Sequence, residues 1–425
     1  MEENNNIPYG WKQVELNSLI NEMLDGGTPA RSVEKYFGGD IPWVVIDDIK
    51  DEIYFTKEYL TKEGINACSS RLWEIGTIII STGATIGNVG MLKIKSATKQ
   101  GICGINFRKT VNNKYMMYLL KTMKAQLLSN SQGSTIREIR PSIIKKFSVI
   151  IPIIKSEQNK IAEILTNIDK AISQTEAIIE KQKRIKIGLI QDLLTNGIDE
   201  NGCIRNEKTH QYKNSLLGRI PKEWAIEKLN DCINKSTSIT YGIVQTYEHI
   251  ENGIPVLRTV DLKENGINSI DNLLRTKKSI SDSYKRTLLL ENDIVCNVRA
   301  SVGDFNLVSI DYVGCNTTRG VARICPSDEI NNKYLLWFLK SYRNEKQMEL
   351  LIKGTTFIDI NIGDLRKIVV LLPSKIEQDL IAEKLEKIQS TFNKYNIELS
   401  KLKSIKTGLM QDLLSGKKRV THLIN

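Results

Sequence analysis

Three residues of one short segment have the types and spacing to hold a metal ion for phosphodiester cleavage. Asp40, Asp48 and Lys50, in GGDIPWVVIDDIK, follow the carboxylate–carboxylate–lysine arrangement that many nucleases use. A related segment, GIPVLRTVDLK at 253–263, keeps the second carboxylate and the lysine but begins with Gly253. Because the equivalent copy lacks one of the three possible metal-binding residues, the pattern favours the interpretation of this segment as the end of a strand with solvated charged side chains. A magnesium-dependent nuclease stays open as an alternative.

Other catalytic patterns are missing from the sequence. There is no G-x-x-x-x-G-K-[ST] segment for an ATPase, and no Pro-Pro for the Asn/Asp-Pro-Pro-aromatic signature of adenine methyltransferases. The three histidines, His210, His249 and His422, are too scattered for a catalytic triad or a zinc site. Seven cysteines without C-x-x-C indicate reduced, mostly buried thiols. We therefore expect a binding protein with no catalytic residue, metal or cofactor of its own.

The charge distribution indicates a polyanionic partner. The chain has a formal charge of +11. Residues 1–92 contain 7 Lys/Arg and 14 Asp/Glu, whereas residues 93–155 contain 13 Lys/Arg and a single acid, Glu138. This split predicts a basic surface that includes Arg140, Lys145 and Lys146, with an evenly solvated face as the alternative.

The length of the chain and its apolar segments limit the classes of protein to which it can belong. At 425 residues the chain is too long for one core, so we expect two or three domains. The segment MEENNNIPYG has no signal-peptide character, and runs such as FSVIIPII are too short to span a membrane. We expect a cytoplasmic protein without a membrane partner.

The second half of the chain repeats the first. KIGLIQDLL (186–194) returns as KTGLMQDLL (406–414), and IPYGWKQVELNSLI (7–20) pairs with IPKEWAIEKLNDCI (220–233). GTIIISTGATIG lies over NDIVCNVRASVG, NNKYMMYLL over NNKYLLWFL, GSTIREI over GTTFIDI, and EQNKIAEIL over EQDLIAEKL. The offset drifts only from 213 to 221, as small loop insertions would cause. The sequence therefore indicates an internal duplication.

Each half ends in a long amphipathic segment with heptad spacing. Apolar residues recur at alternating steps of four and three over more than four heptads, without proline, up to Gly197 and Gly416. About 40 residues at 1.5 Å each give a rod of about 60 Å. Since each helix alone would leave its apolar stripe wet, we expect them to pair antiparallel. The predicted packing residues are Ile161, Leu165, Ile168, Ile172, Ile179, Leu189, Ile381, Leu385, Ile388, Phe392, Leu399, Leu402 and Leu409.

These patterns predict an α+β protein with a pseudo-twofold repeat. Two similar globular domains would be separated by two long antiparallel coiled-coil helices. The expected boundaries are 1–152 for the first domain, 153–215 for the first helix and its polar connector, 216–372 for the second domain, and 373–425 for the second helix.

In this order and repeated twice, the motifs resemble the specificity subunits of type I restriction–modification systems, over essentially the whole chain. The resemblance rests on IPxxW opening each half, GGTPARSVEKYFGGDIPWVVIDDI, GTIIISTGATIGNVG and the GSTI and GTTF turns. It also rests on EQxxIAE at each helix start, GLIQDLL and GLMQDLL at the helix ends, and IDENGCIRNE…LGRIPKEW between the halves.

The resemblance implies a DNA-recognition subunit without catalytic activity. Each globular domain would be a target recognition domain that reads one half of a split site in double-stranded DNA. The helices would set the spacing and dock two methyltransferase subunits, which bind S-adenosylmethionine. Motor-nuclease subunits of the complex would use ATP and Mg²⁺.

Positions where the halves differ within a shared frame are the candidates for reading bases, since two half-sites normally differ. Arg and Gln offer paired hydrogen bonds to guanine and adenine, and Ser/Thr serve base or phosphate. The GGTP loop has no counterpart in TYGIVQTYEHIENGIP at 240–255, so a matching contact there is in doubt. The candidates are Arg31, Lys35, Thr82, Thr85, Gln100, Ser134, Thr135, Arg137, Arg258, Arg299, Ser301, Thr318, Arg319, Thr355 and Thr356.

A third class of function also stays open. A coiled-coil scaffold could assemble proteins through the two helices without contacting DNA. Binding that depends strongly on salt and on Arg140, Lys145 and Lys146 would separate a DNA-binding protein from such a scaffold.

Overall fold

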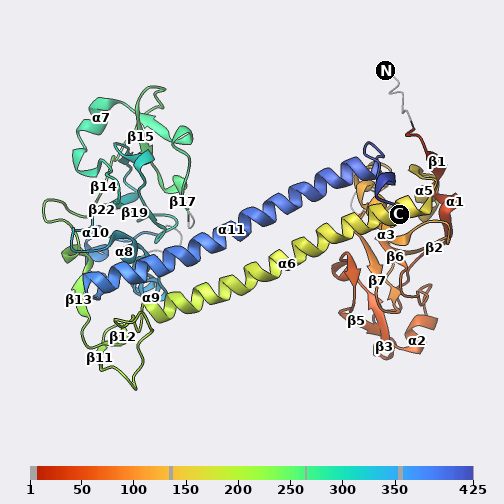
Figure 1. Cartoon of the computed structure of the whole chain (residues 1–425), viewed down its shortest axis with the longest axis horizontal. Helices are drawn as coiled ribbons and strands as arrows, with labels where there is room; N and C mark the ends of the chain where they lie inside the picture. Colours follow the sequence, from red (N-terminus) through yellow and green to blue (C-terminus); the bar gives the residue numbers. More distant parts are fainter. Residues whose placement is uncertain (1–6, 134–136, 264–265, 353–357, 425) are drawn as a thin grey trace. The chain divides into compact units, whose positions relative to one another are not determined.

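The computed structural model of the chain describes residues 7–133, 137–263, 266–352 and 358–424. They form two compact units, labelled by their elements in Figure 1: unit 1 comprises residues 1–177 and 397–425, and unit 2 comprises residues 178–396. Each unit contains part of both long helices, α6 (Lys155–Leu193) and α11 (Lys375–Leu414). The boundaries expected from the sequence gave each long helix a region of its own, and they stay a prediction.

Within its described residues, unit 1 is built on three sheets. A five-stranded sheet has the order β2-β9-β6-β7-β4, a three-stranded sheet has the order β5-β3-β8, and β1 pairs with β10. The strands are β1 (Trp11–Glu15), β2 (Ile20–Asp25), β3 (Phe37–Val44), β4 (Glu52–Ile53), β5 (Glu58–Leu60), β6 (Ile78–Ser81), β7 (Val89–Leu92), β8 (Ala97–Thr98), β9 (Ile102–Phe107) and β10 (Ser148–Pro152). The short helices are α1 (Leu16–Leu19), α2 (Lys62–Asn66), α3 (Asn113–Thr122), α4 (Lys124–Ser129) and α5 (Pro141–Lys145).

Unit 2 has a similar set of sheets in its described part. A four-stranded sheet has the order β14-β22-β19-β20, a three-stranded sheet has the order β18-β15-β21, and β13 pairs with β23. The strands are β11 (Tyr212–Ser215), β12 (Gly218–Pro221), β13 (Ala225–Lys228), β14 (Thr240–Tyr241), β15 (Ile254–Leu257), β16 (Leu262–Lys263), β17 (Gly266–Ile267), β18 (Leu274–Thr276), β19 (Ile294–Asn297), β20 (Phe305–Leu307), β21 (Asn316–Thr317), β22 (Val321–Ile324) and β23 (Val369–Leu372). The short helices are α7 (Lys278–Asp282), α8 (Asn332–Leu339), α9 (Tyr342–Leu351) and α10 (Ile362–Leu365).

The pairings of the two units correspond strand by strand. The antiparallel pair β1–β10 matches β13–β23, and the parallel pair β3–β8 matches β15–β21. The order β2-β9-β6-β7 matches β14-β22-β19-β20. The predicted α+β class and the internal duplication are therefore confirmed. The hairpin β11–β12 spans the expected boundary between the polar connector and the second domain.

The repeated NNKY sequence has a local physical cause. Asn112 precedes α3, and its side-chain oxygen accepts from the N–H of Tyr115 at 2.9 Å. Asn331 precedes α8 and accepts from the N–H of Tyr334 at the same distance. Asparagine is among the residues that best satisfy the free N–H groups of a first helical turn.

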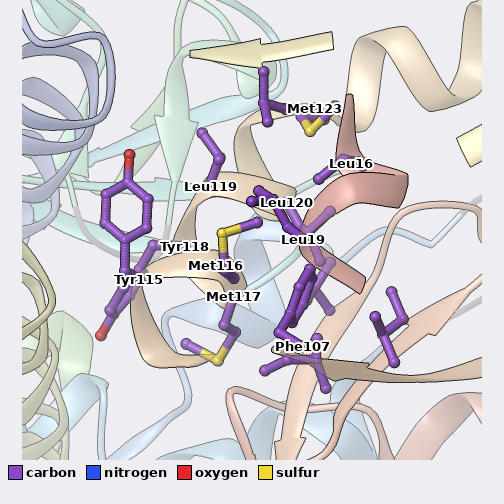
Figure 2. Packing of buried hydrophobic residues seen from close by; sticks show 14 of the residues in the cluster. Leu16, Leu19, Phe107, Tyr115, Met116, Met117, Tyr118, Leu119, Leu120 and Met123 are labelled. Atoms are coloured by element: carbon purple, nitrogen blue, oxygen red, sulfur yellow. The ribbon is translucent and has the colours of Figure 1, made fainter. Parts of the chain in front are cut away.

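The core of unit 1 is organised around α3. Figure 2 shows side chains of this helix packed with Leu16 and Leu19 of α1 and Phe107 of β9. All residues of α3 from Tyr115 to Leu120 are buried, so the helix is covered on every side. Burial of each large apolar side chain stabilises the fold by about 1.5–3 kcal/mol. Ile161 and Leu165, in the first turns of α6, belong to the same cluster and fix that helix to the unit.

Candidate nucleic-acid interface

Three segments of unit 1 meet beyond the end of strand β6. Thr82, the residue after the strand, donates its N–H to the carbonyl of Gly101 and accepts from the N–H of Ile139, both at 2.8 Å. Gly83 forms an antiparallel bridge with Glu138. Main-chain hydrogen bonds therefore fix the loop after β6, the turn before β9 and the segment before α5 against one another.

Unit 2 repeats this arrangement. The N–H of Val298 donates to the carbonyl of Gly320 at 2.9 Å, the N–H of Ile360 donates to Val298 at 3.0 Å, and Arg299 forms an antiparallel bridge with Asp359. We call these two arrangements the loop junctions. They comprise residues 82–85, 99–101 and 137–139 in unit 1, and residues 298–301, 318–320 and 358–360 in unit 2.

Each loop junction contains an alanine in the left-handed region. Ala84 has a φ of 52° and Ala300 a φ of 61°, at equivalent places in the two loops. This conformation costs about 1–2 kcal/mol for a residue with a Cβ. Strain of this kind persists where the surroundings enforce it, and it is concentrated at functional sites. Its presence in both copies points to a loop shape that both units need.

The candidates at the loop junction of unit 1 include both exposed and buried side chains. Thr85, Gln100 and Arg137 are exposed and belong to the junction itself. The side chain of Thr82 is buried, 1% exposed, so it does not reach the surface of this loop. The buried Val298 is its counterpart, which makes this a core position in both units. The candidates that lie outside the described residues are Ser134, Thr135, Thr355 and Thr356.

Unit 2 places four candidates at its loop junction. Arg319 is exposed and Arg299 is half-buried. The hydroxyl of Ser301 accepts from Asn297 at 2.8 Å, which closes the loop after β19. The hydroxyl of Thr318 donates to the carbonyl of Leu257 at 3.2 Å. The two arginines are therefore the long cationic side chains that this junction presents.

Arg31 and Lys35 lie in the segment before β3, away from the junction residues in sequence. Arg31 makes an ion pair with Glu58 at 2.7 Å, and its guanidinium lies 5.0 Å from the ring centroid of Phe37. Lys35 pairs with Glu63 at 2.9 Å, and the hydrogen bond with that carboxylate raises the pKa of Lys35. Exposed pairs of this kind contribute little to stability, so a phosphate can replace the carboxylate at small cost.

The glycine-rich loop has a partial counterpart in unit 2. A Cβ on Gly26 would come within 2.2 Å of the carbonyl oxygen of Thr98, and a Cβ on Gly242 would come within 1.9 Å of the carbonyl oxygen of Thr317. Thr98 and Thr317 occupy equivalent strands, β8 and β21. Unit 2 therefore keeps the first glycine of GGTP, although the rest of the loop differs.

The long helices run side by side in opposite directions within each unit. In unit 1, Lys406 of α11 pairs with Asp169 of α6 at 2.6 Å, and Lys403 pairs with Glu176 at 2.8 Å. In unit 2, the ammonium of Lys186 on α6 lies 5.4 Å from the ring centroid of Phe392 on α11. The start of one helix therefore packs with the end of the other, as an antiparallel pair requires.

The predicted packing residues of the two helices all lie on covered faces. Those nearest the helix starts are buried with the cores of the units, Ile179 is buried in the middle of α6, and the others are half-buried. Isoleucines off this heptad series, such as Ile187 and Ile397, are 58% and 70% exposed. The buried residues are Ile161, Leu165, Ile179, Ile381 and Leu385, and the half-buried residues are Ile168, Ile172, Leu189, Ile388, Phe392, Leu399, Leu402 and Leu409.

One ion pair in each unit closes the antiparallel packing of the two long helices. We call these two ion pairs the helix clasps. In unit 1, the guanidinium of Arg419, beyond the end of α11, holds Glu157 at the start of α6. In unit 2, Arg205, beyond the end of α6, holds Glu377 at the start of α11. Sequence reasoning identified the EQ motif but not its partners, because each arginine lies more than 170 positions away.

The glutamine of the EQ motif fixes each helix to its own unit. Gln158 accepts from the N–H of Asn112 at 2.9 Å and donates to the carbonyl of Pro152 at 3.0 Å. Gln378 makes the same two contacts with Asn331 and Pro373. Both amides are buried, so removal of any of these partners would leave a buried polar group unsatisfied.

Residues 8–184 and 213–404 match the family described as the type I restriction modification DNA specificity domain. The chain belongs to this family. Within the family it is similar to the MjaIX specificity subunit of Methanocaldococcus jannaschii, at 27% identity over 98% of this chain and 95% of that protein. It is also similar to the EcoBI specificity subunit of Escherichia coli, at 26% identity over 68% of this chain and 61% of that protein.

Solved structures of the family share the fold. The type I restriction–modification S subunit from M. genitalium aligns with a TM-score of 0.60 at 17% identity, over 97% of this chain and 98% of that one. A chain from a study of complex assembly and conformational transition in the type I system aligns with a TM-score of 0.58 at 18% identity, over 96% and 98%. At these identities the likeness concerns the fold alone.

The carboxylates at 40 and 48 do not support a nuclease centre in this member of the specificity family. Asp48 is buried and accepts from the main-chain N–H groups of Val45 at 2.9 Å and Lys57 at 3.2 Å. Its counterpart Asp261 caps the equivalent turn by accepting from the N–H of Arg258 at 3.0 Å. A carboxylate used in this way in both units is a structural cap. Asp40 and Lys50 are exposed, and the described residues contain no group of three or more side chains suited to a metal ion.

Asp261 also binds the side chain of Arg258. The guanidinium donates from Nε at 2.9 Å to this carboxylate, and the hydrogen bond raises the pKa of Arg258. Arg258 is therefore held in place by its own turn, which leaves fewer of its donors for a base than Arg299 or Arg319 retain.

The basic surface expected from residues 93–155 is partly neutralised in space. Lys93 and Lys114 pair with Glu52 at 3.2 and 2.5 Å, and Lys121 pairs with Asp51 at 2.7 Å. The acids of residues 1–92 thus lie against bases that follow them in the chain.

Three candidates of this surface keep their charge available. Arg140 and Lys146 are exposed and Lys145 is half-buried, and none of the three makes an ion pair within the described residues. Arg140 follows Ile139, which is hydrogen-bonded to the loop junction of unit 1. The surface they form is smaller than the sequence predicts, but it begins at the junction.

No helix in the described part of the chain is both long and apolar enough to cross a bilayer.

Proposed function

We propose that each unit of this specificity subunit reads one half of a bipartite site in double-stranded DNA. The observation that carries this proposal is the loop junction, which recurs with the same main-chain hydrogen bonds but different side chains. A constant frame suits the shared task of holding a duplex, and variable side chains suit two different half-sites.

The long helices would then set the distance between the half-sites. With 39 and 40 residues they are long enough for this role, and the helix clasps and buried glutamines join each helix start to its own unit. Rigid joining of two readers makes the second binding event nearly intramolecular, provided that the separation of the half-sites matches.

Catalysis belongs to partner subunits in this proposal. Two methyltransferase subunits would dock on the helices and bind S-adenosylmethionine, and motor-nuclease subunits of the complex would use ATP and Mg²⁺. The chain itself supplies the DNA specificity and no catalytic residue.

Selection from a pool of randomised duplex DNA tests the proposal. The chain, purified with its methyltransferase subunits, should enrich a motif of two short blocks separated by unspecified positions of fixed number. Enrichment of one continuous block, or of no motif, would contradict it.

A neutralised variant separates DNA binding from a scaffold role. Replacing Arg140, Lys145 and Lys146 by Gln should weaken duplex binding at all sequences and flatten the dependence of log K on log salt. The slope should be lower by about 0.9 for each phosphate that the variant no longer neutralises. Unchanged affinity and slope would exclude these residues from the DNA face and favour a scaffold.

A further inference from the structure

Among the positions at which the side chains of the two loop junctions differ, two are neighbours in the main-chain frame. Gly83 of unit 1 corresponds to Arg299 of unit 2, because each forms the antiparallel bridge described above, with Glu138 and Asp359. Gln100 corresponds to Arg319, because each immediately precedes the glycine whose carbonyl accepts from the loop. Unit 1 thus carries a glycine and a glutamine where unit 2 carries two arginines.

The main chain at these positions accepts either set of side chains. A Cβ on Gly83 would meet only the Cα of Gly101, at 3.6 Å, which is an ordinary contact. The φ of Gly83 lies outside the left-handed region, so a larger residue is not strained there. In unit 2 a Cβ on Gly320 would lie 3.9 Å from the Cβ of Arg299, which places Arg299 directly beside the turn that carries Arg319. One compact frame therefore presents both positions together.

The two arginines are also available to a ligand. Within the described residues neither guanidinium makes an ion pair or a hydrogen bond, in contrast to other arginines of the unit. Arg323 is bound to Asp293 at 2.6 Å, Arg258 to Asp261, and Arg366 to the carbonyl of Ile239 at 2.7 Å. These three arginines are therefore bound within unit 2, whereas Arg299 and Arg319 have no such partner among the described residues.

The chemistry of the two sets indicates different bases. A guanidinium donates two parallel hydrogen bonds to O6 and N7 of guanine, whereas a glutamine amide pairs with N6 and N7 of adenine. Phosphate contacts are needed equally by both units, and the hydroxyls at Thr85 and Ser301 are common to both junctions. Because the two half-sites differ in sequence, Gln100, Arg299 and Arg319, which differ between equivalent positions of the shared frame and carry paired hydrogen-bonding groups, are assigned to bases.

We propose that Arg299 and Arg319 read guanine in the half-site of unit 2, and that Gln100 beside Gly83 reads adenine in the half-site of unit 1. This inference rests on the proposed bipartite reading of DNA and names the residues and bases that make its two halves differ.

The experiment exchanges the two sets. Variant chains with Arg299→Gly and Arg319→Gln, and separately with Gly83→Arg and Gln100→Arg, are purified with their methyltransferase subunits and used for selection from randomised duplex DNA. Arg219→Ala, which removes an exposed arginine of the β11–β12 hairpin paired with Glu207, serves as the matched control. Thermal unfolding of each chain checks that it is folded.

The expected result is a change confined to one half of the motif. The first variant should lose guanine preference in one block by about tenfold or more, as expected when a paired hydrogen bond to the base is removed, and leave the other block intact. The second should introduce a guanine preference into that other block. Arg219→Ala should change neither block.

Three results would overturn the inference, and they differ from one another. If the variants bind all sequences more weakly, with a shallower salt dependence and the same motif, the arginines contact phosphates and bipartite reading survives. If the unmodified chain enriches no two-block motif, the proposed function itself fails. Should Arg299→Gly with Arg319→Gln unfold the chain, Arg319→Gln alone provides the test, because it removes the guanidinium donors that pair with guanine. An unaltered guanine preference in that variant overturns the assignment.

Discussion

Arg419 holds the carboxylate of Glu157 with two nitrogens, from Nε to Oε1 at 2.6 Å and from Nη2 to Oε2 at 2.7 Å. The glutamate is 1% exposed and the two residues are 262 positions apart. The hydrogen bonds with this carboxylate raise the pKa of Arg419. Because Arg205 and Glu377 repeat the contact in unit 2, the helix clasp is a structural device of each copy.

Removing the arginine of a clasp should destabilise its own unit. Arg419→Met leaves a buried carboxylate without its partner, which costs about 3 kcal/mol or more. Hydrogen exchange should accelerate in β1 and in the last turns of α11, while unit 2 keeps its protection. The double variant Arg419→Met with Glu157→Gln is the control and should recover part of the stability. If hydrogen exchange accelerates equally in both units of the Arg419→Met variant, the clasp does not act locally.

Acid should weaken unit 1 through Glu52. Burial by itself raises the pKa of Glu52, but hydrogen bonds from Lys114, Tyr54 and Lys93 outweigh it and lower the pKa to about 2, from an ordinary value of 4.5. Because the folded-state pKa is depressed, this stabilisation is present above pH 4.5 and is lost as the pH falls toward 2.

The measurement is urea unfolding of the chain and of Glu52→Gln between about pH 7 and about pH 2. The difference in unfolding free energy should be largest near neutral pH and should vanish at the acid end of this range. Glu163→Gln, which removes an exposed partner of Lys160, is the control and should show a small difference throughout. A Glu52 difference that does not change with pH would contradict the assignment.

Two glycines inside the long helices should be replaceable with a gain in stability. Gly188 and Gly408 occupy equivalent places, and a Cβ on either would meet nothing within 4 Å. Alanine should therefore stabilise each helix by about 0.5–1 kcal/mol through its higher helix propensity. Thermal unfolding of the two single variants measures this, and Gly26→Ala, whose Cβ would collide with Thr98, should do the opposite. A loss of stability in Gly188→Ala or Gly408→Ala would contradict this prediction and show that the fold requires a glycine at that position.

Much of this organisation can be predicted because it is local or repeated. The aligned halves indicate the duplication, and the heptad spacing of residues such as Ile161 and Leu385 places them on the covered helix face. The alignment of GATIG with RASVG also places Gly83 over Arg299, although only the hydrogen bonds of the loop junction show that their main chains coincide.

The features that the sequence does not reveal depend on contacts between distant segments. The separation of charge along residues 1–155 predicts one basic surface, but Glu52 and Asp51 fold against Lys93 and Lys121. Thr82 is polar and is a candidate for DNA contact by its sequence, yet strand β9 and the segment before α5 enclose it. Periodicity contains no information on such pairings.

The spacing role of the helices predicts a response to insertion. Adding one heptad to α6 and one to α11 preserves the covered faces and lengthens each helix by about 10 Å. The gap between the two blocks of the DNA motif should grow by up to about three base pairs, given about 34–36 Å per turn of 10–10.5 base pairs. Insertion in one helix only should instead disrupt the pairing. An unchanged gap after the double insertion would refute the spacing role.

The exchange of one recognition unit tests the central claim most directly. Residues 1–152 are replaced by the matching segment of a relative in the family, and the DNA motif bound by the chimera with its methyltransferase subunits is determined by selection from randomised duplex DNA. If the two units read DNA independently, one block of the motif should change to that of the relative, while the other block and the gap should stay the same. A motif in which both blocks change, or neither, would contradict the account.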